Sequence, residues 1–160
     1  MTPRDGRRDF AFLYQSEQGA IDARVWLRGA APLVAIFLVA TGIWMALRPI
    51  GSRSLAVRTL FDPATLAANI YQLFYILAVI LLAISWVNLS AKRFRDRGMV
   101  PPVGLAGIFP LFALLDGALR WLQPQMPDIL PRWSVYAGDG AVALALIWTV
   151  AVCADFFPRK

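Results

Sequence analysis

Long stretches without a charged residue constrain this chain more than any other feature. Nineteen residues separate Arg28 from Arg48, and 29 separate Asp62 from Lys92, with no charge in either interval. An apolar stretch of about 18 or more residues without charges is typical of a transmembrane helix. The composition agrees, because 59% of the 160 residues are hydrophobic and only 16% are charged. The sequence therefore predicts an integral membrane protein.

Four segments of the chain are apolar and long enough to cross a bilayer. We expect an all-α fold, a polytopic transmembrane helical bundle with spans at about 29–47, 64–89, 101–122 and 139–157. The second span exceeds the roughly 30 Å of a hydrocarbon core and must tilt or project from it. The whole chain, 1–160, is predicted to be a single transmembrane domain, in which 1–28 form a cytoplasmic or interfacial N-terminal segment.

The ends of these spans carry recognisable signals. Ser16 is a predicted N-cap for a helix that leads into the first span, and Arg48-Pro49 is expected to end that span. Trp26 is expected at a membrane interface, where indole rings are enriched. Pro110 is predicted to kink the third span, and Asp139 to lie at the N-terminus of the fourth, where the helix dipole favours a carboxylate.

The distribution of Lys and Arg predicts which way the protein faces. In a four-span chain the N-terminus, the middle loop and the C-terminus share one side of the membrane. Eleven of the 16 basic residues fall on that side. Short loops rich in Lys and Arg stay in the cytoplasm. We therefore expect both termini inside, in a bacterial inner (plasma) membrane.

Several kinds of chemistry are excluded by residues that the sequence lacks. There is no histidine, Cys153 is the only cysteine, and no Gly-rich phosphate-binding motif occurs. No side-chain pair offers a nucleophile beside a base. We therefore predict no catalytic residues, no metal site and no cofactor. The net charge of +6 is assigned to topology and anionic lipid, and no nucleic acid is expected, because aromatic residues are not interleaved with the basic ones.

A run of basic residues after the second span is the main candidate binding site. Lys92, Arg93, Arg95 and Arg97 are candidates to contact anionic lipid headgroups, or else they only fix the topology. Asp96 within the run is expected to bond loop amides or to pair with Arg93.

Polar residues within and beside the spans leave two interpretations open. Ser85, Asn88 and Lys92 share a helix face, which could line a polar cavity or make ordinary hydrogen bonds between helices. The carboxylates at span ends are expected to be structural, with an i, i+4 pair in the third span; they are Asp116 (paired with Arg120), Asp139 and Asp155.

A stripe of small residues follows one face of the fourth span. Its members, four residues apart, are Ala137, Ala141, Ala145, Thr149 and Cys153. Small residues let membrane helices approach closely, so we expect this stripe to face another helix. Matching small surfaces are predicted at Gly104 and Gly107 in the third span and at Gly42 and Ala46 in the first.

Two segments resemble one known family. They are Gly19-Ala-Ile-Asp-Ala-Arg24-Val-Trp26-Leu27 and Lys92-Arg93-Phe94-Arg95-Asp96-Arg97-Gly98. Together they are similar to the domain-of-unknown-function 805 family of small bacterial inner-membrane proteins (the YhaH type). Arg93 and Asp96 match the family's Arg and Asp, while Arg95 stands where the family has His. The resemblance implies a polytopic inner-membrane protein without an assigned activity. We predict structural roles for Arg24, Trp26, Asn88 and Asp96.

These observations lead to one expected function and one alternative. The first is a small structural, accessory or assembly protein of the inner membrane, whose basic cytoplasmic loops contact anionic lipid. The alternative is a component of an oligomeric transporter or channel. The expected partners are membrane lipids and either a second copy of this chain or another membrane protein.

Overall fold

The computed structural model describes residues 10–51, 62–123 and 125–156, and within them it is helical without strands. The elements are the short π-helix η1 (Ala11–Gln15) and the helices α1 (Ala23–Gly51), α2 (Pro63–Asp96), α3 (Pro102–Leu122) and α4 (Arg132–Cys153). Each of the four long helices is apolar enough to cross a membrane. The predicted all-α fold with four spans is therefore confirmed.

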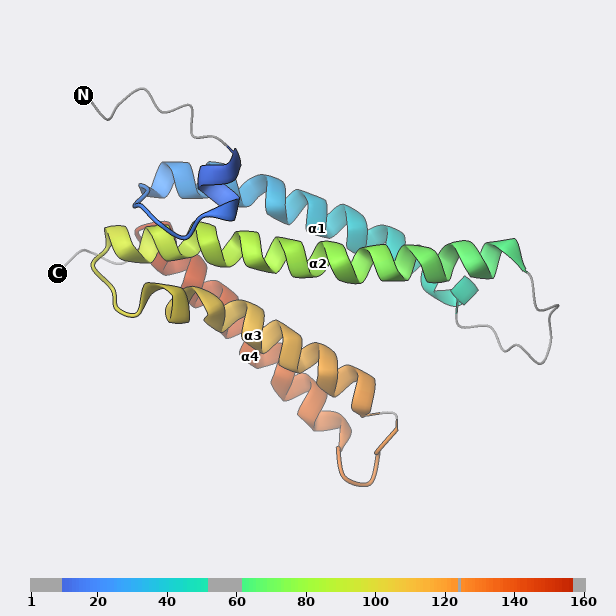
Figure 1. The fold of residues 1–160 in the computed structure, drawn as a ribbon. Helices are drawn as coiled ribbons and strands as arrows, with labels where there is room; N and C mark the ends of the chain where they lie inside the picture. Colours follow the sequence, from blue (N-terminus) through green and yellow to red (C-terminus); the bar gives the residue numbers. More distant parts are fainter. Residues whose placement is uncertain (1–9, 52–61, 124, 157–160) are drawn as a thin grey trace.

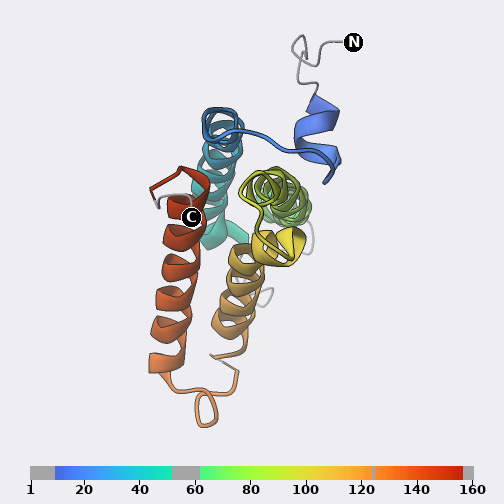
Figure 2. The ribbon, with the colours of Figure 1, turned by 90° about the vertical axis from the view of Figure 1, so that its left-hand side faces the viewer.

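The four long helices form two hairpins that diverge from a common end. Figure 1 shows α1 and α2 side by side, whereas α3 and α4 leave them at an angle. The hairpins meet where α2 ends, and η1 and the end of α4 lie at this end too, on opposite sides of α2 (Figures 1 and 2). We call this end the junction: it consists of η1, the starts of α1 and α3, and the ends of α2 and α4.

Helix α2 is the longest element and reaches well into the junction. Its 34 residues correspond to about 51 Å at 1.5 Å per residue, more than a bilayer core of about 30 Å. It extends seven residues beyond the predicted end at Leu89. Near its end, every residue from Leu89 to Phe94 is fully buried. The helix continues there because partners from other elements surround it.

The ends of α1 differ from the sequence-based prediction. The helix begins at Ala23 and not at Ser16, because the Asp22 carboxylate accepts a hydrogen bond from the Val25 amide at 2.8 Å and caps the first turn. Ser16 instead accepts a bond from the Gln18 amide, 3.1 Å away, in the connection before the helix. Pro49 does not end the helix. It lies in the last turn, where a proline removes only one backbone hydrogen bond.

Helix α4 begins and ends earlier than predicted. It starts at Arg132, directly after an extended Pro131, so Asp139 lies inside the helix and not at its N-terminus. It ends at Cys153 because Asp155 adopts a left-handed conformation with a φ of 63°. Pro110 lies inside α3, as the sequence indicates.

The hydrophobic core is concentrated at the junction. Trp26 from α1, Trp86 and Phe94 from α2, and Ala106 from α3 are all buried there, together with Cys153 from α4. Away from the junction the helices expose large apolar side chains, such as Leu73 of α2 and Leu144 of α4, each 70% exposed. The junction is therefore the part of the protein that its own side chains hold together, and the diverging arms present apolar faces.

The stripe of small residues on α4 packs inward over the half nearest the junction. Ala145, Thr149 and Cys153 are buried, whereas Ala137 is exposed. The prediction that the stripe faces another helix is confirmed for this half. The matching surface predicted on the first span is wrong, because Gly42 and Ala46 are exposed and α4 packs against α3 and α2. On α3 the fully buried small residue is Ala106, between the predicted Gly104 and Gly107.

Candidate functional site

The last two turns of α2 direct their polar side chains to two different parts of the junction. Asn88, Lys92 and Arg95, spaced by four and three residues, contact the N-terminal segment. Arg93 and Arg97, spaced by four, contact the end of α4. The basic run predicted from the sequence is thus divided between two helix faces. One face binds the N-terminal segment, and the other binds the end of α4.

The first face supplies hydrogen-bond donors to backbone carbonyls that precede α1. The Asn88 amide donates to the Tyr14 carbonyl at 2.7 Å, and the Lys92 ammonium donates to the carbonyls of Leu13, at 3.3 Å, and Ser16. The Arg95 guanidinium donates to the Gly19 carbonyl at 2.9 Å and to that of Glu17. The Leu13 and Tyr14 carbonyls lie at the end of η1, and those of Ser16, Glu17 and Gly19 follow it. The last carbonyls of a helix have no donor within the helix, so side chains of α2 supply donors to this end.

Lys92 occupies an unusual environment for a charged residue. It has no exposed surface, and its ammonium lies 4.9 Å from the centre of the Phe12 ring. Within the described ranges, carbonyl oxygens and this aromatic face surround it, and no carboxylate forms an ion pair with it. Carbonyl acceptors and a cation–π contact compensate for part of the hydration that the ammonium loses.

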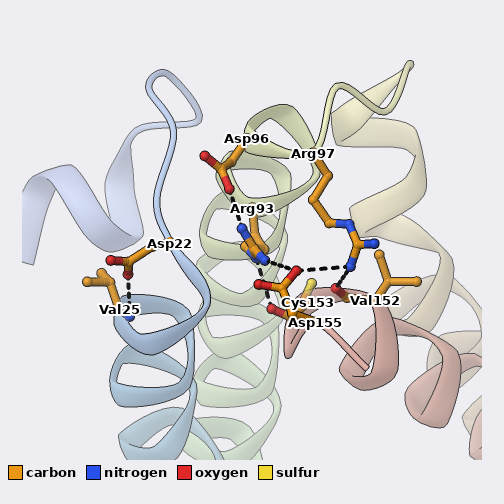
Figure 3. Close-up of polar contacts among 8 residues, drawn as sticks. All are labelled: Asp22, Val25, Arg93, Asp96, Arg97, Val152, Cys153 and Asp155. Carbon is orange, nitrogen blue, oxygen red and sulfur yellow. Dashed lines mark hydrogen bonds and ion pairs between the residues drawn. The ribbon is translucent and has the colours of Figure 1, made fainter. Parts of the chain in front are cut away.

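Arg93 is the centre of the second face (Figure 3). It is also fully buried, and its Nε donates to the Cys153 carbonyl at 2.9 Å. Its two terminal nitrogens form ion pairs with Asp96 and, at 2.5 Å, with Asp155. The predicted pair between Asp96 and Arg93 is confirmed. A buried charge is tolerated when it is paired and hydrogen-bonded. This guanidinium pairs with two carboxylates and donates hydrogen bonds from Nε and from the terminal nitrogen beside Asp96.

Asp155 is placed by an unusual turn at the end of α4. The Phe156 amide bonds the Ala151 carbonyl at 3.0 Å, and the Asp155 amide bonds the Val152 carbonyl at 3.3 Å. This is a Schellman motif, in which glycine normally takes the left-handed position. Here Asp155 takes it, with a φ of 63°, and its carboxylate reaches Arg93 and, at 3.3 Å, Arg97. Asp adopts this conformation more readily than most residues. The two ion pairs of its carboxylate therefore suggest a role beyond ending the helix.

Replacing Asp155 tests that role. If the residue served only as a helix cap, Asp155→Gly would relieve the left-handed strain and stabilise the protein by about 1 kcal/mol. We expect Asp155→Gly to lower the thermal unfolding midpoint in detergent, because the loss of a charged hydrogen-bond partner costs about 1.5–3 kcal/mol. Asp155→Asn, which tolerates the same φ, should lower it too. A higher midpoint for the glycine variant would contradict this interpretation.

Two further hydrogen bonds join α1 to the junction. The Trp26 indole donates to the Ser90 hydroxyl of α2 at 3.2 Å, and the Tyr14 hydroxyl donates to the Gly29 carbonyl at 3.0 Å. Burial raises the pKa of the Tyr14 hydroxyl above its ordinary value, so the group stays a donor. Trp26, predicted at a membrane interface, is buried between protein side chains, with 1% of its surface exposed.

A second polar cluster lies at the opposite end of the α3–α4 hairpin. Arg120 pairs with Asp116 at 2.8 Å, as the i, i+4 spacing predicts, and also with Asp139 of α4. Gly138 allows the helices to come close, because a Cβ at that position would lie 2.5 Å from an Asp116 carboxylate oxygen. These ion pairs of Asp116 and Asp139, and those of Asp155 at the junction, agree with the structural roles predicted for the three carboxylates.

The predicted site residues differ in how much of their surface is accessible. Lys92 and Arg93 have no exposed surface, so of the basic run only Arg95 and Arg97 offer any surface to a lipid headgroup. Asn88 bonds the N-terminal segment, Trp26 is in the core, and Arg24 is exposed. Sequence reasoning missed the carbonyl acceptors, which have no residue-type signal. It also missed Asp155 as a partner, although this acid follows an apolar span on the side of the basic run.

The junction is built from ion pairs and backbone capping. Within the described ranges, no group of three or more His, Cys, Asp or Glu side chains is placed to hold a metal ion. Comparisons of the chain with protein-family models, curated proteins and solved structures gave no match. The resemblance to the domain-of-unknown-function 805 family rests on the segments Gly19–Leu27 and Lys92–Gly98 alone.

Proposed function

We propose that this multi-pass membrane protein is a structural or accessory component of a bacterial inner membrane, with the junction on the cytoplasmic side. The charge distribution supports the orientation, because the side that contains the junction carries eleven of the 16 Lys and Arg residues. In this orientation the junction contacts anionic lipid of the inner leaflet. The resemblance of the two segments at Gly19–Leu27 and Lys92–Gly98 to an inner-membrane family supports the same location.

The position of the charged side chains is the observation that supports an accessory role. The buried cations and their partners lie at the junction, and the Asp116–Arg120–Asp139 cluster lies at the far end of α3 and α4. Between these ends, the polar contacts that the described residues make between α1 and α2 involve neutral groups, such as Thr41 with Tyr75 at 3.0 Å. Ionisable residues at mid-membrane depth mark ion and proton pathways. A protein that stabilises or positions other components needs only apolar faces, which the arms present.

The orientation is tested by labelling single cysteines in a Cys153→Ser background. Val100, 84% exposed beside the junction, and Ile129, 73% exposed in the connection between α3 and α4, lie at opposite ends of α3. A membrane-impermeant maleimide added to spheroplasts should label Ile129→Cys at once, and Val100→Cys only after the membrane is opened. The reverse pattern would overturn the proposed orientation.

A flux assay separates the accessory role from the alternative, a component of an oligomeric transporter or channel. Purified protein in liposomes should pass potassium ions and protons no faster than empty vesicles do. Flux that rises with the amount of protein, and that changes when residues on the exposed faces of α2 are replaced, would favour the alternative instead.

A further inference from the structure

Two arginines near the junction have no protein partner within the ranges that the structure describes. Arg24 and Arg28 lie in the first two turns of α1, and both are exposed. The four cations of the basic run differ, because each of them donates to a protein carbonyl or carboxylate. The nearby Asp22 carboxylate caps the first turn of α1. Among the residues that the structure describes at this end, the cations that remain for an outside ligand are therefore on α1.

Arg24 and Arg28 are arranged to act together. Residues four apart lie on one helix face, with Cβ atoms about 5–6 Å apart. The same face continues along α1 through Ala31, Pro32 and Ala35, which are all exposed. The neighbouring Leu27 is also 48% exposed. A pair of guanidinium groups thus stands at the polar end of an apolar, lipid-facing surface.

We propose that Arg24 and Arg28 together bind the phosphate of an anionic phospholipid headgroup, whose acyl chains lie along the face that begins at Ala31. This inference rests on the proposed membrane function and names the residues that make its lipid contact. A guanidinium presents a planar fork that matches a phosphate bidentately, and two forks can share one phosphate. The position at the start of a spanning helix places them at headgroup depth.

The test is the retention of phosphatidylglycerol by the purified protein, measured by native mass spectrometry. We expect Arg24→Gln/Arg28→Gln to weaken retention by about tenfold or more, since each basic residue near an anionic surface contributes to binding. The matched control is Arg48→Gln/Arg132→Gln, which removes two exposed arginines at the far ends of α1 and α4. The control should retain the lipid as the unchanged protein does. Phosphatidylcholine should be retained weakly by all three proteins.

Two results would overturn this assignment. One is equal retention by the Arg24→Gln/Arg28→Gln variant and the unchanged protein, and the other is an equal loss in the control variant, which would indicate a general effect of charge. Arg24→Lys/Arg28→Lys keeps the charge and removes the planar forks, so it should retain less lipid than the unchanged protein. Retention in detergent does not depend on membrane orientation, so it can fail while the cysteine labelling succeeds, and the reverse.

Discussion

Arg93→Met should destabilise the protein more than any other single charge removal in the basic run. The substitution leaves Asp96 and Asp155 without their buried partner and leaves the Cys153 carbonyl without a donor. Breaking a buried ion pair by removing one member costs about 3–5 kcal/mol. We expect a large drop in the thermal unfolding midpoint in detergent and faster proteolysis after Asp155, because the end of α4 loses its attachment to α2.

The matched control is Arg95→Met. It removes the same charge from the same run, so the balance of Lys and Arg across the membrane is equal in both variants. Arg95 is only partly buried and its hydrogen bonds to Glu17 and Gly19 are solvent-exposed. Its loss should cost about 1 kcal/mol or less. If both variants unfold at the same temperature, the central role of Arg93 is wrong.

Trp26→Ala is the second substitution with a large expected effect. The indole is almost fully buried, packs edge-to-face on Trp86 at 5.6 Å and donates to Ser90. Replacing a buried Trp by Ala costs about 3–5 kcal/mol through lost contacts and the cavity that remains. The thermal unfolding midpoint of this variant in detergent should therefore fall far below that of the unchanged protein.

Trp133→Ala is the control for this substitution. Both tryptophans lie in the first turns of spanning helices, but Trp133 is 68% exposed. Its replacement should change the free energy of unfolding in detergent by about 0.5 kcal/mol or less. Similar effects at the two positions would show that Trp26 does not pack in the core that we describe.

Sequence reasoning succeeded for the existence of the four spans and failed for their ends. The apolar intervals predicted four spans because hydropathy over about 20 residues decides membrane insertion. The ends of the helices depend on local bonds instead. Asp22 rather than Ser16 caps α1, and α4 begins seven residues before Asp139. A tryptophan at a span end has the same sequence signature whether it faces lipid headgroups or, like Trp26, another helix.

The basic run illustrates a second limit. The count of Lys and Arg describes which side of the membrane a loop prefers, but it contains no information on the acceptors that the side chains find. Lys92 and Arg93 are adjacent, and a helix turns by 100° per residue, so they point to different parts of the junction. Their acceptors are mostly backbone carbonyls, which every residue carries and no sequence pattern marks. Only the pair between Arg93 and Asp96, three residues apart, was accessible to sequence reasoning.

The ion pairs of Arg93 also have a consequence for biosynthesis. Arg93 leaves the ribosome 60 residues before Cys153, whose carbonyl it caps, and Asp155 follows later still. During that interval α1 and α2 are already synthesised, while Arg93 lacks its partners from α4, so we expect its guanidinium to stay hydrated. The arrival of α4 completes the set and allows water to leave. Insertion of the first hairpin and closure of the junction are therefore separate events, and translation of the fourth helix sets the earliest time of closure.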